Sequence, residues 1–362
     1  MRGEKMKEAK ESLFSRVVKA AVNTVNDKPV VQKETVHVNK LNMLDIDTSS
    51  VNVKILIHEE QQIDVLLETY EDGPKLSVND SKERVEISAK TERQISFSLF
   101  KNLPTCKMTV KLPRDIAAHW KVQTGSGKVT ANGILADTVF FGANSGMVNI
   151  SDVKANKLEL KASSGRIIAT NIKVDQLNYT VSSGVADFDS IYGDIQGSAN
   201  SGAISMRNIN SEILDVRASS GNINLEDLQS KKVTAKANSG TIYINRIAVE
   251  DADTTISSGN IKVFKLDGNL TGHANSGNIN VELTGDSALD LRVGSGNIDV
   301  EVDVQTLNAA FDLRTNSGDI MADIPLEVEN KLDRKTTGVV GEGNRPIKLQ
   351  SRSGNIRIKD RR

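Results

Sequence analysis

Hydrophobic and polar residues alternate along most of the chain, and the alternation restarts at a nearly constant interval. The dipeptide Ser-Gly occurs twelve times, and its first ten copies follow one another every 18 or 19 residues. The last two copies come after longer gaps of 22 and 36 residues. The glycines of the twelve copies are Gly127, Gly146, Gly165, Gly184, Gly202, Gly221, Gly240, Gly259, Gly277, Gly296, Gly318 and Gly354. Such a fixed period is typical of a repeat protein.

Each repeat carries apolar residues at fixed places around its glycine. Around Gly277, for example, Leu270 and Ala274 precede the glycine, and Ile279 and Val281 follow it. A spacing of two residues is the period of a β-strand, whose alternate side chains point to the same face. One repeat of this size cannot bury its own apolar face, so the repeats must stack. The pattern therefore predicts an all-β fold, a single parallel β-solenoid of about 19 residues a coil.

The recurring glycine is predicted to be a structural corner of each coil. A sharp bend favours glycine, because glycine adopts a positive φ at no steric cost. The serine and asparagine residues beside it can bond the local backbone, and stacked copies can form ladders along the rod. The alternative interpretation is a ligand-binding ridge of serine and asparagine side chains.

The chain is predicted to have three regions. Residues 1–28 form an amphipathic helix, residues 29–115 a strand-rich first region of the solenoid, and residues 116–362 the regular repeat with a C-terminal cap. Four apolar residues at helical spacing in the first region are Leu13, Phe14, Val17 and Val18. The helix also carries six basic residues and three glutamates over residues 1–24. It is expected either to cap the rod or to lie on an anionic membrane surface.

Composition and charge exclude several classes of function. The formal net charge of −1 argues against a nucleic-acid partner, which requires excess positive charge. The single cysteine, Cys106, excludes an internal disulfide and a cysteine-rich zinc site. The start of the chain lacks the apolar stretch of a secretory signal, and no segment is apolar enough for a membrane-spanning helix. The expected location is the cytoplasm, or peripherally the inner face of the membrane.

No catalytic, cofactor-binding or metal-binding residues are predicted. None of the four histidines is paired at metal-ligand spacing, and no phosphate-loop or nucleophile-elbow motif occurs. Acidic residues recur six positions before the glycines, but basic residues follow two positions later in most copies, as in Asp215 and Arg217. This spacing favours salt bridges on the surface over an acid–base pair. We therefore expect no enzyme, no cofactor and no small-molecule substrate.

Several segments resemble one known family. They are the repeated Ser-Ser-Gly-Asn-Ile motif, Leu44–Val53, Met108–Pro113 and the final Ser353–Ile356. Over about residues 41–358 the chain resembles the bacterial "putative adhesin" domain of unknown function, seen in YvlB-like and LiaX-like proteins. The resemblance implies a β-solenoid, no known catalytic residues, and in some members a link to envelope stress.

Three functional hypotheses follow from these observations. The first is a non-enzymatic scaffold or binding protein in the bacterial envelope-stress response, with another protein or the membrane surface as its partner. The second is a surface-exposed, adhesin-like protein. The third, which the missing catalytic residues make weaker, is a carbohydrate-active enzyme.

Overall fold

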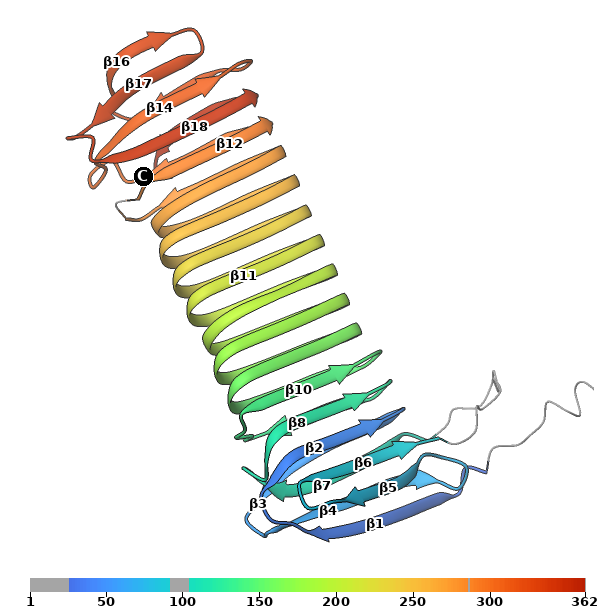
Figure 1. The fold of residues 1–362 in the computed structure, drawn as a ribbon. Coiled ribbons are helices and arrows are strands. Elements are labelled where there is room, and N and C mark those ends of the chain that lie inside the picture. Colours follow the sequence, from blue (N-terminus) through green and yellow to red (C-terminus); the bar gives the residue numbers. More distant parts are fainter. Residues whose placement is uncertain (1–25, 92–103, 286, 362) are drawn as a thin grey trace, which may run out of the picture.

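The computed structural model describes residues 26–91, 104–285 and 287–361 of the chain, and these form one elongated rod of β-strands (Figure 1). The expected helix, with Leu13, Phe14, Val17 and Val18, lies outside the described residues. The described part of the chain contains strands and no helix. No helix in that part is therefore available to cross a membrane. The prediction of an all-β, largely parallel fold is confirmed.

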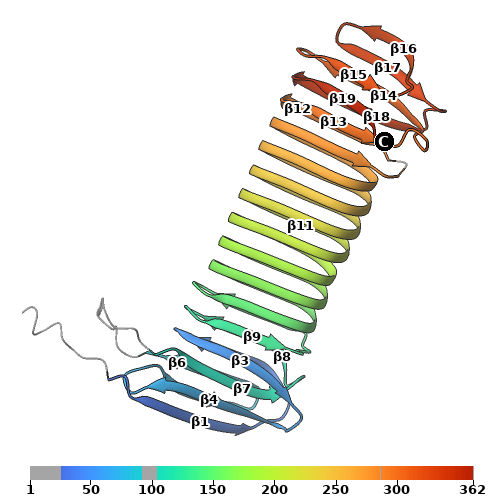
Figure 2. The same ribbon diagram turned by 180° about the vertical axis from the view of Figure 1, so that it is seen from behind.

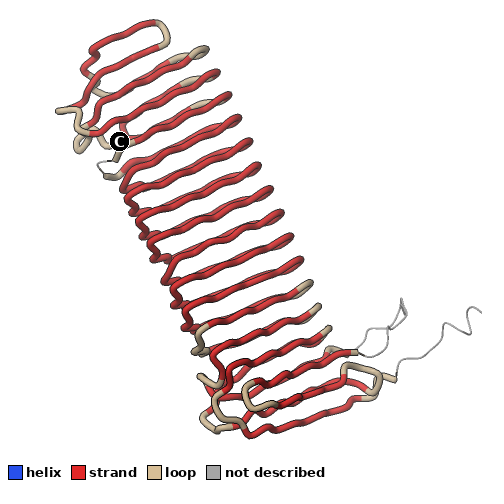
Figure 3. The backbone as a smooth tube through the Cα atoms, in the orientation of Figure 1, coloured by secondary structure: helices blue, strands red, loops and turns tan. Residues whose placement is uncertain are grey.

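The middle of the rod consists of coils with two facing strands, one on each side (Figures 1 and 2). The strands are β8 (Ala117–Thr124), β9 (Lys128–Asn132), β10 (Thr138–Ala143), β11 (Met147–Leu283), β12 (Leu289–Ser295) and β13 (Ile298–Val302). Strand β11 is 137 residues long because its hydrogen-bonded ladder continues through the bends of successive coils (Figure 3). Neighbouring coils pair in parallel, so that Val139 lies between Trp120 and Leu158.

The first end of the rod is closed by antiparallel strands. Its strands are β1 (Pro29–His37), β2 (Leu41–Thr48), β3 (Val51–His58), β4 (Gln62–Tyr70), β5 (Lys75–Asp80), β6 (Arg84–Lys90) and β7 (Cys106–Pro113). The coil β2–β3 lies between the coil β6–β7 and the coil β8–β9. Outside it, β5 pairs with β6, β4 with β7, and β1 with β4, all antiparallel. These strands cover the edge that a solenoid otherwise leaves open.

The other end places its last coil out of sequence order. The strands here are β14 (Ala309–Thr315), β15 (Ile320–Asp323), β16 (Glu327–Leu332), β17 (Lys335–Val340), β18 (Arg345–Ser353) and β19 (Ile356–Asp360). Strand β18 pairs in parallel with both β12 and β14, so the final coil lies between two earlier ones. The polar segment 331–345, which looks like a loop in the sequence, instead contributes to the β16–β17 hairpin that covers β14.

The core follows the predicted alternation and contains one further row. The residue two positions after the repeated glycine is buried in eleven of the twelve copies, and Ile279 has no exposed surface at all. In the copy at Gly318 this residue, Ile320, is half-buried. Trp120 and Cys106 are buried as well. A row seven positions after the glycine, which falls outside the predicted alternation, is also buried: Ile134, Val153, Ile172, Ile191, Ile209, Leu228, Ile247 and Leu266. Its side chains close the core at the edge where the chain returns from β9 to β10.

Nine of the twelve repeated glycines have a positive φ, between 119° and 153°, as expected for a glycine corner. A second bend lies six residues after each of the first eight repeated glycines, with φ between 53° and 79°. The residues there are Gly133, Asp152, Asn171, Ser190, Asn208, Asp227, Arg246 and Lys265. Aspartate and asparagine tolerate this conformation better than other non-glycine residues. Side-chain bonds between neighbouring coils, as from Asn208 to Asp189 at 2.8 Å, support the bend.

The repeated glycines are required mainly because the coils approach each other closely. A Cβ atom at Gly165 would lie 1.8 Å from the carbonyl oxygen of Gly146, although Gly165 has no left-handed φ. The same close contact recurs between the glycines of successive coils, which form one column along the rod. At the C-terminal end of this column the order in space is Gly296, Gly354, Gly318, so the last coil of the sequence again lies between two earlier coils. The asparagine after the glycine accepts a backbone N–H from the next coil, as Asn278 does from Asn297 at 3.0 Å. The predicted ladder at this bend is therefore present.

One of the shorter coils makes room for a buried tyrosine. A Cβ atom at Gly197 would lie 2.2 Å from the ring of Tyr179, so this glycine is needed for packing and not for a tightened corner. The Tyr179 ring lies 4.8 Å from the Phe188 ring. Its buried hydroxyl has no hydrogen-bond partner among the described residues, and burial raises the pKa of Tyr179.

We expect Tyr179→Phe to stabilise the protein. An unsatisfied buried polar group costs about 1–3 kcal/mol, and the substitution removes it while keeping the ring. The free energy of unfolding in urea should rise by about 0.5–1 kcal/mol, since a small void offsets part of the gain. A decrease would show that the hydroxyl is satisfied in solution.

Candidate functional site

A groove runs along the edge of the rod at which the chain passes from β9 back to β10 and through the equivalent bends of later coils. This edge of the backbone is on the left in Figure 3. The groove consists of three adjoining hollows of about 850, 700 and 620 Å³. Its walls are the outward residues eight and ten positions after the repeated glycines. Small residues lie between them on the floor, among them Ala155, Gly193 and Ser211. We call this surface the lateral groove.

Tyr192 lines all three hollows of the lateral groove. Its side chain is 49% exposed, although the neighbouring Ile191 is fully buried. The ammonium of Lys173, one coil earlier, lies 5.6 Å from the centre of the ring. Below the tyrosine, Gly193 has φ of 130°, and a Cβ atom there would lie 1.8 Å from the carbonyl oxygen of Val174. Because these two coils approach each other closely, no side chain at position 193 fills the groove beside the Tyr192 ring.

The charges along the lateral groove are mixed, and some already have partners. Asp194 accepts the backbone N–H groups of Glu212 and Ile213 at 3.1 and 2.9 Å, which connects two coils. Lys231 donates to Glu212 at 2.6 Å, and this hydrogen bond raises the pKa of Lys231. These groups therefore maintain the groove wall.

Other charged groups of the lateral groove remain available. Within the ranges that the structure describes, Asp137, Lys154 and Asp175 make no side-chain hydrogen bond or ion pair, although all three line the largest hollow. They are exposed and belong to three successive coils. The groove thus offers both acceptors and a donor next to an aromatic ring.

The front face of the rod differs from the lateral groove. Its outward aspartates pair with the arginine two positions later, at 2.8 Å for Asp215–Arg217 and 2.9 Å for Asp290–Arg292. The hydrogen bond from Arg314 holds the pKa of Asp312 below its usual value. The predicted salt bridges are confirmed, so this row is not an acid–base pair.

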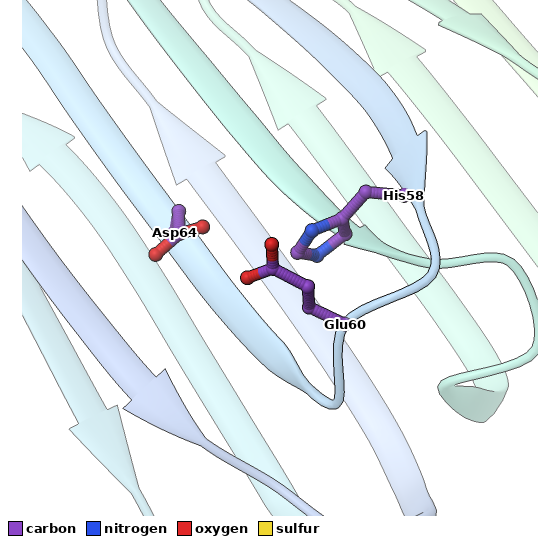
Figure 4. A group of neighbouring side chains, drawn as sticks. All are labelled: His58, Glu60 and Asp64. Atoms are coloured by element: carbon purple, nitrogen blue, oxygen red, sulfur yellow. The ribbon is translucent and has the colours of Figure 1, made fainter.

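A second cluster of polar side chains lies at the turn between β3 and β4, near the first end of the rod (Figure 4). One ligand atom each of His58, Glu60 and Asp64 lies within 4.8 Å of the others. The sequence pattern predicts no metal-binding residues, whereas this turn brings an imidazole and two carboxylates together. The spacing of two and four residues around a hairpin turn is the signal that points to this cluster.

The His58 cluster is held by groups outside it. The Nε2 atom of His58 lies 2.9 Å from the carbonyl oxygen of Gln62. Asp64 accepts a hydrogen bond from the Thr35 hydroxyl at 2.7 Å and two from the Gln62 amide at 3.2 and 3.1 Å. The Thr35 hydrogen bond is the main cause of the lowered pKa of Asp64, and the charges of His58 and Lys111 contribute.

None of the residues that the sequence singles out lies in the lateral groove of the described structure. The repeated glycines come together in one column at the edge opposite the lateral groove, where their backbones leave no room for a ligand between the coils. Leu13, Phe14, Val17 and Val18 fall outside the described residues. The lateral groove was not predicted, because its outward positions vary in type from coil to coil. Only the small residue between two outward ones recurs there.

The fold and its two surfaces define a capped, parallel β-solenoid with a lateral groove. The chain belongs to the Toastrack family of domains of unknown function (DUF4097), whose model matches residues 41–196 and 189–359. This agrees with the resemblance noted in the sequence.

Solved structures similar to this chain come from several bacteria. A "putative lipid binding protein" from Parabacteroides distasonis is 17% identical, with 75% of this chain and 97% of that chain covered and a TM-score of 0.37. A "putative adhesin" from the same organism is 14% identical, with 76% and 98% covered and a TM-score of 0.33. A "putative cell adhesion protein" from Clostridium sporogenes is 11% identical, with 92% and 100% covered and a TM-score of 0.22. A comparison with curated proteins finds no match.

Proposed function

We propose that this protein is a non-enzymatic binding protein whose lateral groove holds an extended polysaccharide. The observation that carries the proposal is Tyr192, a half-exposed ring at the point where three hollows meet. The fold is able to bury a tyrosine ring, because Tyr179 is buried in the core. A large aromatic side chain left in the middle of a groove is typical of a binding surface.

The chemistry of the lateral groove favours a sugar polymer over a purely apolar ligand. A tyrosine ring offers an apolar face to the C–H face of a sugar ring and a hydroxyl at its rim. Carboxylates such as Asp137 and Asp175 accept hydrogen bonds from hydroxyl groups, and amides such as Asn210 and Gln229 both donate and accept. These groups repeat at the spacing between coils, about 4.8 Å, so they can contact successive units of one chain.

A binding role without catalysis is supported by the state of the groove's charged groups. Lys231 and Asp194 are engaged in holding neighbouring coils, as described above. Lys231 is protonated at neutral pH, as an exposed lysine ordinarily is, and it already donates to Glu212, so it is a poor general base.

The resemblance to LiaX-like proteins supports placing this binding role in the envelope-stress response. We propose a location in the cytoplasm or at the inner face of the membrane. Fractionation of cells tests the location, since recovery mainly from the outer surface would favour the adhesin-like alternative.

Tyr192→Ala should weaken polysaccharide binding at least tenfold, which corresponds to about 1.4 kcal/mol. A panel of bacterial polysaccharides, with cytoplasmic storage glycans as well as cell-wall polymers, identifies a ligand, and titration of the two proteins then compares the affinities. The matched control is Tyr243→Ala, because Tyr243 packs at a tilt against Phe264 with ring centres 5.7 Å apart and lines none of the three hollows. Equal losses in both variants, or binding of an extended peptide and no glycan, would contradict the proposal.

A further inference from the structure

We propose that His58, Glu60 and Asp64 form a binding site for a divalent cation of the zinc type. This site is separate from the lateral groove, since none of its residues lines a hollow of the groove. One imidazole nitrogen and two carboxylate oxygens lie within 4.8 Å of one another. Bound zinc holds its nitrogen and oxygen ligands at about 2.0–2.2 Å, so small side-chain rotations bring all three atoms to one ion.

The surroundings of His58 prepare the imidazole for a metal. Its Nε2 atom, 2.9 Å from the carbonyl oxygen of Gln62, can only donate there, because a carbonyl oxygen has no proton to give. The hydrogen bond therefore places the ring proton on Nε2 and the lone pair on Nδ1. Metal-binding histidines commonly have this arrangement, with one nitrogen on the ion and the other donating to a carbonyl or carboxylate.

Asp64 is oriented in a comparable way from a different strand. The Thr35 hydroxyl, on the neighbouring strand β1, donates to it at 2.7 Å, and the Gln62 amide donates to both of its oxygens. A carboxylate oxygen has more than one lone pair, so Asp64 can accept these bonds and still bind an ion. Neither Thr35 nor Gln62 is a ligand, and both fix the position of one.

The mixture of ligands selects the class of metal. Calcium and magnesium prefer oxygen ligands alone, and soft metals prefer thiolates, whereas zinc accepts imidazole and carboxylate together. Three protein ligands leave a fourth position to water. Because the ligands belong to β3, the following turn and β4, the ion would join the two strands at the first end of the rod.

Zinc titration of the full chain, purified without a histidine tag, tests the site. A fluorescent chelator as competitor should report one strong zinc equivalent per chain, and zinc should raise the melting temperature. Calcium at the same concentration should not displace zinc. The absence of a strong equivalent, or displacement of zinc by calcium, would overturn the assignment.

Four variants separate binding from damage to the fold. His58→Ala and Asp64→Asn should remove the strong equivalent and the rise in melting temperature. Thr35→Val keeps all three ligands and should weaken zinc binding about tenfold, at the lower end of the range for such supporting groups. The control is His273→Ala, since His273 is exposed on a regular coil and contacts Asn275. Unchanged zinc affinity in His58→Ala, or an equal loss in His273→Ala, would overturn the proposal.

Discussion

Ile279→Asp should prevent accumulation of folded protein. The Ile279 side chain is fully buried and pairs with Ile298 in the next coil, so an aspartate there has neither water nor a cation nearby. An unpaired buried charge is among the few changes that cost more than about 4 kcal/mol. We expect the variant in the insoluble fraction, or unfolded by circular dichroism at a temperature at which the natural protein is folded.

The control for this prediction is the adjacent Asn280→Asp. It introduces the same carboxylate one residue later, where the side chain points outward and is partly exposed. Its melting temperature should stay within a few degrees of the natural value, because exposed substitutions usually change stability by less than about 0.5 kcal/mol. If Ile279→Asp folded as well as Asn280→Asp, the inward assignment of the whole row would be wrong.

Gly221→Ala should destabilise the rod far more than an alanine normally does. A Cβ atom at Gly221 would lie 1.7 Å from the carbonyl oxygen of Gly202, and the φ of 146° also disfavours any side chain. The carbonyl group of Gly202 and the Cα atom of residue 221 that would carry the new Cβ both belong to paired strands. Neither can move without breaking neighbouring hydrogen bonds. We expect a loss above about 3 kcal/mol, the upper end of the usual cost of overpacking.

Urea unfolding of Gly221→Ala measures this loss, with Ser220→Ala as the control. Ser220 is the exposed residue directly before the glycine, and its substitution adds no atom between the coils. If the two variants had equal midpoints, the column of glycines would not be in contact. The close approach of the coils would then have to be abandoned as the reason for the repeated glycine.

The sequence determined the coil and its inward positions, because burial requires the same side of the strand in every repeat. The alternation that contains Ile279 and Leu270 is therefore visible without a structure. The bend at Asp227 was not visible, since aspartate is common in many kinds of turn. Its left-handed φ of 55° becomes clear only from the coordinates.

The order of the terminal coils could not be predicted for a different reason. The apolar pattern of β18 fits next to any coil of the rod, because all coils present the same two faces. Nothing in the alternation around Ile347 shows that it pairs with Leu289 on one side and Phe311 on the other. The lateral groove and the His58 cluster likewise depend on which outward side chains become neighbours, and outward positions are not constrained by burial.

The internal position of the last coil has a consequence for biosynthesis. A ribosome releases the chain from its N-terminus, and parts that emerge early generally fold first. The strands up to β13 can stack as they emerge, but β14 has no correct parallel neighbour until β18 has been made. Until then, the exposed edges of β12 and β14 match each other well enough to pair wrongly. Completion of the rod therefore has to wait until β18 has been made, and a chain that ends before residue 345 lacks the strand that pairs with both β12 and β14.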